Sequence, residues 1–337
     1  MADLDLGIAL REAQIAPESV PDILLRIARP LGATDVVVYL VDFAQTTLEP
    51  VPDRGTHADL PEAQPVVGSM AGRAFTDGFV YSGQYSAYRK RRHGNPSRHL
   101  PAGKFVVFAQ NHDQVGNRMR GDRLARLVCF ESLKLAAGVV LLSPFLPLLF
   151  MGEEYGEVAP FLYFVHHGDT GLIEAVRKGR KEEFAAFGWK GEIPDPQDED
   201  TFLRSRPDPA LRESGNHARL LELHRELIRI RKTDPVLRRT DRESMLVVPF
   251  EKERALLILR RDGSARTAAV FHFGDVPAYL PLPLPGEGWE KVLDSADVRW
   301  GGPGGAAPER PDPSGGIVCA LRPNSFILLS NSGKENR

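Results

Sequence analysis

The chain has 337 residues, of which 42% are hydrophobic and 26% are charged, the composition of an ordinary globular protein. Its formal net charge of −2 gives no basic field, so nucleic acid is not an expected partner. The longest apolar stretch, Leu135–Phe150, is interrupted by Gly138, Pro144 and Pro147 and is too short to span a bilayer, so no membrane association is expected.

The start of the chain and its cysteines indicate the compartment. Met1–Leu10 carries Asp3 and Asp5 and no long apolar region, so we expect no signal peptide. Cys129 and Cys319 lie far apart inside apolar segments. They form either a disulfide or two buried free thiols, and the second interpretation is favoured, which predicts a cytoplasmic protein.

Residues 1–77 form a compositional unit of their own. Pro17–Leu31 has apolar residues at helical spacing, and Gly32 ends this predicted helix. Two strands are then predicted, at Asp35–Asp42 and at Thr47–Val51. This order resembles the front half of a GAF-type sensor domain, which implies a truncated α+β segment that cannot bury a full core alone.

Residues 78–100 are rich in Tyr, Arg, Ser and Gly, and they include the basic run Lys90–His93. In a near-neutral chain, a solvated loop over a ligand cleft is favoured over a nucleic-acid patch. The rings of Tyr81, Tyr85 and Tyr88 either offer flat faces to a sugar or pack within the loop itself.

The most informative stretch is Phe105–Arg118, FVVFAQNHDQVGNR. The apolar run Phe105–Phe108 predicts a strand buried on both faces, as in a parallel sheet, and Arg123–Leu142 predicts the helix that follows. The polar cluster between them is either a strand exit capped by turn-forming Asn and Asp or a polyol-binding site. Amides, imidazole and carboxylate match the donors and acceptors of sugar hydroxyls, which favours the second interpretation.

These residues carry a family resemblance. QNHDQVGNR resembles the fourth conserved region of the alpha-amylase clan of glycoside hydrolases. Within that clan, its residues are similar to those of the malto-oligosyltrehalose trehalohydrolases. The likeness covers about Gly78–Ser330 and extends to the motifs at Gly78–Asn95, Leu148–Glu157 and Pro194–Ser205.

The resemblance implies an α/β plus all-β fold. Residues 78–238 would be the last strands and helices of a (β/α)8 barrel, with Phe105–Asp113 as the seventh strand and Phe145–Phe150 as the eighth. An antiparallel β-sandwich would follow at 239–331 and a disordered tail at 332–337. The join with the GAF-like segment, near Asp77–Gly78, is an unusual place for a domain boundary and indicates a fusion or a mis-assembled reading frame.

The second half of the chain changes its periodicity. Pro160–Arg212 is polar and irregular, which predicts a long functional loop, and Asn216–Lys232 predicts a helix. Within that helix, surface or packing roles are favoured over metal binding for His217 and His224. Beyond Asp241 the period becomes two, and strands are predicted at Leu246–Phe250, Ala255–Arg260, Thr267–Phe273, Ala278–Leu284, Trp289–Leu293, Ile317–Leu321 and Ser325–Leu329.

The resemblance also implies a chemistry, namely hydrolysis of the α-1,4 bond that adjoins the trehalose end of malto-oligosyltrehalose. It implies no metal, no organic cofactor and no obligate protein partner. Asp113 matches the acid that stabilises the distorted sugar in the transition state. The resemblance also implies that neighbouring residues contact the glucan. The predicted substrate-binding residues are Asn111, His112, Gln114, Val115, Gly116, Asn117 and Glu154, while Glu153 is either a second contact or a surface carboxylate.

Retaining hydrolysis also needs a nucleophile and a general acid, about 5–5.5 Å apart. The clan places its nucleophile two residues after an Arg, at the end of a buried strand upstream of QNHD. Here only Asp42 ends such a strand, residue 40 is Leu, and no apolar run before Phe105 ends in Glu. Neither residue is identifiable, so the chain is either a hydrolase by descent without turnover or a non-catalytic sensor or carbohydrate-binding remnant. We also expect exposed apolar surface where the barrel strands lack neighbours.

Overall fold

The computed structural model describes residues 39–41, 47–50, 64–65, 70–86, 89–186, 193–311 and 317–331. The chain divides into two compact units, Met1–Ala74 and Phe75–Arg337. In the first unit, β1 (Tyr39–Val41), β2 (Thr47–Pro50) and β3 (Gln64–Pro65) form a three-stranded antiparallel sheet. The two strands predicted in this region are confirmed, whereas the predicted helix before them lies outside the described residues.

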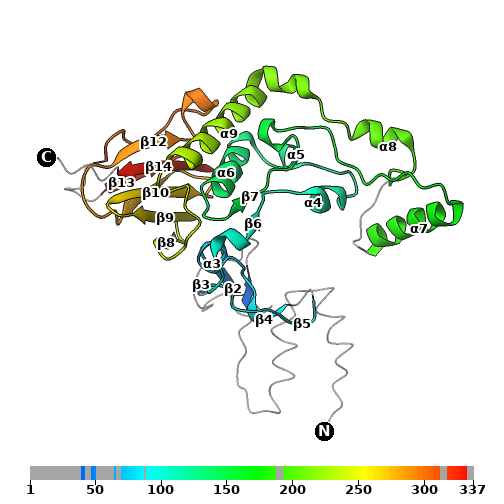
Figure 1. The fold of residues 1–337 in the computed structure, drawn as a ribbon, viewed down its shortest axis with the longest axis horizontal. Helices are drawn as coiled ribbons and strands as arrows, with labels where there is room; N and C mark the ends of the chain where they lie inside the picture. Colours follow the sequence, from blue (N-terminus) through cyan, green and yellow to red (C-terminus); the bar gives the residue numbers. More distant parts are fainter. Residues whose placement is uncertain are drawn as a thin grey trace, which may run out of the picture. The chain divides into compact units, whose positions relative to one another are not determined.

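The end of the second unit is built from two antiparallel sheets (Figure 1). The larger sheet has the strand order β12-β14-β10-β9-β8, and β11 pairs with β13 to form the smaller one. All seven strands predicted beyond Asp241 are confirmed. Their bounds are Met245–Phe250 (β8), Ala255–Asp262 (β9), Ala265–His272 (β10), Ala278–Leu282 (β11), Glu290–Asp294 (β12), Ile317–Leu321 (β13) and Ser325–Asn331 (β14).

One apolar core joins the two sheets. Leu257 and Val270 from the larger sheet meet Leu280 and Cys319 from the smaller one, with Trp289 beside them. Each of these side chains is at most 1% exposed. Alternate residues of the strands face this core because side chains of a strand point to opposite faces, which is why a period of two was visible in the sequence.

Two helices connect this sandwich to the preceding region. α6 (Phe130–Leu141) packs against β14, β10 and α9 (Gly215–Thr233), as Figure 1 shows. The α9 helix was predicted, and its face of Leu220, Leu223 and Leu227 is fully buried. The helix α6 approaches the sheet closely at Gly138, where an added Cβ would lie 2.5 Å from the Phe326 ring.

Two cationic side chains hold these helices in place by donating hydrogen bonds to backbone carbonyls. The Lys134 ammonium in α6 donates to the carbonyls of Ser295 (2.7 Å) and Trp300 (3.3 Å). From α9, the guanidinium of Arg231 donates to carbonyls of Leu141, Ser143 and Phe145 at 2.5 to 2.7 Å. Those carbonyls belong to the end of α6 and the turn after it, where a helix leaves acceptors without intrahelical partners.

That turn leads into a pair of parallel strands. β6 (Val106–Val107) pairs with β7 (Leu146–Pro147) in parallel, as expected for neighbouring barrel strands. The prediction that this strand is buried on both faces is wrong, because Val106 is 53% exposed and Leu146 43% exposed. Among the strands that the structure describes, β6 and β7 pair only with each other, so the outer edge of each is unpaired. The exposed side chains of Val106 and Leu146 confirm the exposed apolar surface that we expected.

The helices of the middle region also differ from expectation. Instead of one helix over 123–142 there are two, α5 (Leu124–Leu127) and α6, because Val128 and Cys129 between them have extended backbone. The region expected to be irregular contains α7 (Thr170–Ala186) and α8 (Glu199–Arg204). Both cysteines are free, as predicted, but Cys129 is exposed rather than buried, because it lies in this surface break.

At the start of the second unit, the predicted loop over residues 78–100 is a hairpin. α3 (Met70–Asp77) precedes β4 (Ser82–Ser86) and β5 (Arg91–Gly94), which are antiparallel. Tyr81 packs within the hairpin, 5.7 Å from the Phe79 ring and 5.4 Å from the His93 ring. Tyr85 is exposed, and Tyr88 lies outside the described residues. In the described part of the chain, every helix is too short or too polar to cross a bilayer.

The close contact at Gly138 yields a prediction about stability. Gly138→Ala should lower the free energy of unfolding by about 1–3 kcal/mol, because a methyl group would overlap the Phe326 ring at a packed helix–sheet interface. The matched control is Gly179→Ala in α7, where an added Cβ meets nothing within 4 Å. It should raise the free energy of unfolding by about 0.4–1 kcal/mol, because alanine reduces the conformational entropy of the unfolded chain. Urea unfolding of both variants measures the two values, and equal effects would contradict the proposed packing.

Candidate functional site

The candidate site begins where the chain leaves β6. Asn111 is the N-cap of the short helix α4 (His112–Gly116), and its Oδ1 accepts a hydrogen bond of 2.9 Å from the amide of Gln114. His112 and Asp113 therefore lie in the first helical turn and point into solvent, with side chains 72% and 71% exposed. The His112 Nε2 is 3.5 Å from the Asp113 Oδ1.

A cleft of about 270 Å³ brings four of the predicted residues together. His112, Asp113, Gly116 and Asn117 line one side of it, and residues 161–164 line the other. We call Phe161–Phe164 the aromatic wall, because three of its four members are aromatic. In the part of the chain that the structure describes, Asp113 is the one carboxylate in the lining of this cleft.

The aromatic wall is held close to α4. The Phe161 amide donates to the Gly121 carbonyl at 2.9 Å, and Gly121 has a φ of +58° with no room for a Cβ against the Phe161 backbone. Arg180, from α7, donates to the carbonyl of Gly116 at 2.9 Å and to the Oδ1 of Asn117 at 3.3 Å. Its guanidinium also lies 4.6 Å from the centre of the Tyr163 ring, so one side chain joins the two sides of the cleft.

Other predicted site residues lie outside the cleft lining. Val115 is 2% exposed and its side chain is buried, so a contact of Val115 with substrate would come from its backbone. Glu154 pairs with Arg212 at 3.7 Å, and Gln114 is exposed beyond the lining. Asn111 is engaged as the cap of α4.

Two buried polar side chains behind the site, Gln110 and Arg123, make contacts that the sequence did not predict. Gln110, directly before the cap, accepts at Oε1 from the amide of Leu124 at 3.0 Å. Its neighbour Arg123 is 1% exposed and donates to the carbonyls of Ala159 (2.7 Å) and Met151 (2.8 Å). The sequence holds no signal for these contacts, because the partners of Arg123 are backbone carbonyls rather than side chains with a recognisable spacing.

The pKa values of two carboxyl groups beside Arg123 are shifted in opposite directions. Burial raises the pKa of Glu153 to about 7, against weaker opposing effects of hydrogen bonds from the Phe150 amide and from Gln110. Burial also acts to raise the pKa of Glu157, but four donors outweigh it and hold that pKa below its usual value. These donors are the Tyr155 hydroxyl and the amides of Val158, Ala159 and Asp208. Glu157 is therefore a structural carboxylate, whereas Glu153 titrates near neutrality.

The two helix histidines serve packing. His217 Nδ1 lies 2.8 Å from the Tyr155 carbonyl, and the buried His224 places its Nδ1 2.9 Å from the Leu220 carbonyl. Within the residues that the structure describes, three or more metal-ligating side chains do not gather anywhere.

Comparison with known proteins identifies relatives of part of this chain. It is 43% identical over 221 residues to the malto-oligosyltrehalose trehalohydrolase of Rhizobium sp. (strain M-11), covering 64% of this chain and 36% of the relative. The protein of the same name from Saccharolobus solfataricus is 44% identical over 160 residues, covering 48% and 27%. The chain spans about a third of the length of these curated relatives, or less. No protein-family model matches the chain.

Solved structures agree with this relationship. A Salmonella typhimurium crystal structure described as a "Putative alpha Amylase" superimposes with a TM-score of 0.62 at 33% sequence identity. The match covers 77% of this chain and 41% of that one. The chain therefore shares its fold with part of an alpha-amylase-like protein, and the family resemblance stated from QNHDQVGNR is confirmed.

The raised pKa of Glu153 yields a prediction of pH-dependent stability. The folded state binds the Glu153 proton more tightly than the unfolded state, so this carboxyl contributes stability at low pH that is lost as the pH rises from 4.5 through 7. Relative to Glu153→Gln, which cannot ionise, the wild-type chain should lose up to about 3 kcal/mol over that range. Urea unfolding at a series of pH values measures the difference.

The substitution Glu182→Gln in α7 provides the control, because Glu182 is an exposed carboxylate that is not among the groups acting on the Glu153 pKa, so this variant should preserve the wild-type pH dependence. A constant difference between the wild-type chain and Glu153→Gln across pH 4.5–8 would contradict the raised pKa.

Proposed function

We propose that this homologue of the malto-oligosyltrehalose trehalohydrolases carries the stabiliser side of a trehalose-releasing glycoside hydrolase site. On its own, it binds α-glucan at the cleft between α4 and the aromatic wall. The observation that carries the proposal is the placement of His112 and Asp113 in the first turn of α4, across a cleft from three aromatic residues.

The chemistry of the cleft suits a pyranose chain. The Asp113 carboxylate accepts hydrogen bonds from vicinal sugar hydroxyls, and the imidazole of His112 beside it both donates and accepts. The aromatic wall offers apolar surface to the C–H faces of the sugar rings, with Tyr163 40% exposed at its centre. In the reaction of the family, Asp113 would hold the hydroxyls of the distorted ring and so favour the transition state over the ground state.

We further propose that β6 and β7 are the last two strands of a (β/α)8 barrel, preceded by a GAF-like segment. The parallel pairing of the two strands and the polar residues at the exit of β6 support the barrel assignment. So do the exposed side chains of Val106 and Leu146, which in a closed barrel would be covered by interior side chains of other strands or by the surrounding helices. The GAF-like assignment rests on the order of elements in residues 1–77 alone.

The chain alone is proposed to bind without turnover. Retaining hydrolysis needs a nucleophile and a general acid 5–5.5 Å apart in addition to the stabiliser, and among the described residues the lining of the cleft contains Asp113 as its one carboxylate. This observation favours the second candidate function, non-catalytic carbohydrate binding, for the isolated polypeptide.

Calorimetric titration with maltoheptaose tests the binding site. We expect binding by the wild-type chain and an affinity about tenfold lower for both His112→Ala and Asp113→Asn, because each removes a polar contact to the sugar. Asp275→Asn, an exposed carboxylate in the turn before β11, is the matched control and should bind as the wild-type chain does. Binding that is absent, or that survives both cleft substitutions, would overturn the proposed site.

A further inference from the structure

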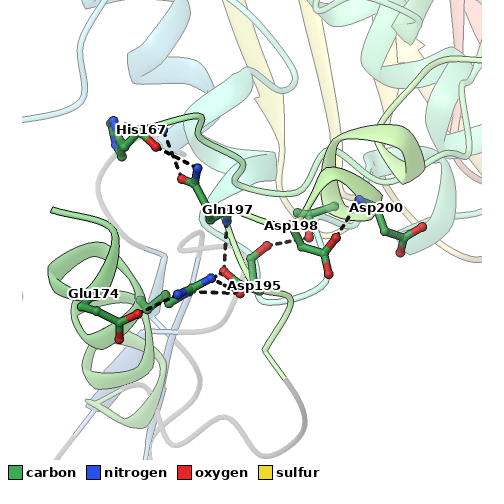
Figure 2. Close-up of polar contacts among 8 residues, drawn as sticks. His167, Glu174, Asp195, Gln197, Asp198 and Asp200 are labelled. Atoms are coloured by element: carbon green, nitrogen blue, oxygen red, sulfur yellow. Dashed lines mark hydrogen bonds and ion pairs between the residues drawn. The ribbon is translucent and has the colours of Figure 1, made fainter. Parts of the chain in front are cut away.

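The segment after α7 supports the aromatic wall rather than facing the cleft itself. Gln197 forms two hydrogen bonds with one residue of the chain that continues from the wall, His167 (Figure 2). Its Oε1 accepts from the His167 amide at 3.1 Å, and its Nε2 donates to the His167 carbonyl at 3.0 Å. The Val165 amide donates to the Pro196 carbonyl at 2.8 Å, so the side-chain pair extends a backbone contact as a strand neighbour would.

The same segment holds the wall at two more points. The Oγ of Ser205 accepts from the Leu162 amide at 3.0 Å and donates to the Thr201 carbonyl at 2.8 Å. The Phe202 ring lies 5.2 Å from the Phe164 ring in a T-shaped contact. We call residues 195–205 the clamp, because they hold the chain from Leu162 to His167 along its length.

An ion pair anchors the clamp to α7. Arg177 donates from Nε to both carboxylate oxygens of Asp195 at 3.0 Å and from Nη2 to Oδ2 at 2.8 Å, and its Nη1 reaches Glu174 at 2.6 Å (Figure 2). These hydrogen bonds from Arg177 hold the pKa of Asp195 below its usual value. Asp195 Oδ1 also accepts from the amide of Gln197 at 3.0 Å, which fixes the turn from which the Gln197 side chain departs.

The helix α7 therefore reaches the cleft by two routes. In one route, Arg177 binds Asp195, Asp195 binds the Gln197 amide, and the Gln197 side chain binds His167, which follows the wall in the sequence. The other is Arg180, one turn further along α7, which contacts Gly116 and the Tyr163 ring directly. The aromatic wall and the chain that follows it are thus both held by α7, and Arg180 also joins the wall to α4.

We infer that Gln197 is a positioning residue for α-glucan binding, which sets the placement of the aromatic wall opposite Asp113 through its paired contacts with His167. This inference rests on the proposed function. Both polar ends of the Gln197 amide are occupied by the backbone of His167, so Gln197 would act through the wall and not through a contact with the sugar. The acidic Pro-rich motif at residues 194–200 would then serve the cleft without lining it.

The test compares Gln197→Ala with Asp275→Asn on the full chain. Asp275 is an exposed carboxylate in the turn before β11, outside both the clamp and the lining of the cleft. We expect Gln197→Ala to lower the affinity for maltoheptaose about tenfold, with Asp275→Asn binding as the wild-type chain does. Hydrogen exchange of the His167 amide, read by mass spectrometry, should accelerate in Gln197→Ala only.

Gln197→Glu separates the loss of hydrogen bonding from the loss of packing. It keeps the acceptor for the His167 amide but places a second oxygen against the His167 carbonyl, so its affinity should fall as far as that of Gln197→Ala although its volume is conserved. Thermal unfolding of each variant shows whether the chain remains folded.

Three results would overturn the inference. Wild-type affinity in Gln197→Ala, with His112→Ala still impaired, would refute the role of Gln197 and leave the proposed function intact. Unprotected exchange of the His167 amide in the wild-type chain would refute the clamp whether or not glucan binds. Absence of maltoheptaose binding by the wild-type chain would remove the proposed function and this inference together.

Discussion

The buried guanidinium of Arg123 joins the exits of the two parallel strands. It donates to carbonyls at Met151 and Ala159, on either side of the turn that follows β7, and lies 4.9 Å from the centre of the Phe150 ring. Burial lowers its pKa, and the nearby Glu157, Tyr155, Glu154 and Glu153 act in the opposite direction. A cation placed in apolar surroundings is costly unless it is paired and hydrogen-bonded, so the surrounding carboxylates and carbonyls are required rather than incidental. The next residue, Leu124, is bonded to Gln110, and this brings the exit of β6 to the same point.

The site that results is assembled from elements far apart in the sequence. Helix α4 presents His112 and Asp113, the chain after the β7 turn provides the aromatic wall, and α7 ties the two together through Arg180. Each of these elements is fixed from behind by charged groups bonded to backbone, with Arg123 at one end and Asp195 at the other. The exposed polar side chains of His112 and Asp113 thereby face a defined partner surface, the aromatic wall. Precise placement of this kind is what binding an extended sugar chain requires, since each misplaced contact weakens affinity.

The sequence predicted those parts of the molecule whose periodicity is strong. The strands of the sandwich alternate between core and solvent, and the apolar stripe of α9 repeats at helical spacing, so both were found. Helix α7 was missed because most of its side chains, including Leu172 at 46% exposed, face solvent and leave no apolar stripe to recognise. The aromatic wall was missed because its residues FLYF follow a proline in what looked like a long loop. The contacts of Gln197 and Arg123 could not be predicted, because an amide or a guanidinium that binds backbone carbonyls leaves no pattern of partner residues in the sequence.

We propose that, among the residues that the structure describes, this polypeptide brings one of the three acidic groups of a retaining α-glucosidase to its cleft, and that it binds glucan without cleaving it. The most direct measurement is trehalose release from malto-oligosyltrehalose incubated with the purified chain, quantified against an enzyme-free blank. We expect no release above that blank at any protein concentration at which maltoheptaose binding is detected. Trehalose release that rises in proportion to the protein, and that Asp113→Asn abolishes, would show that a nucleophile and a general acid reach Asp113 and would contradict this account.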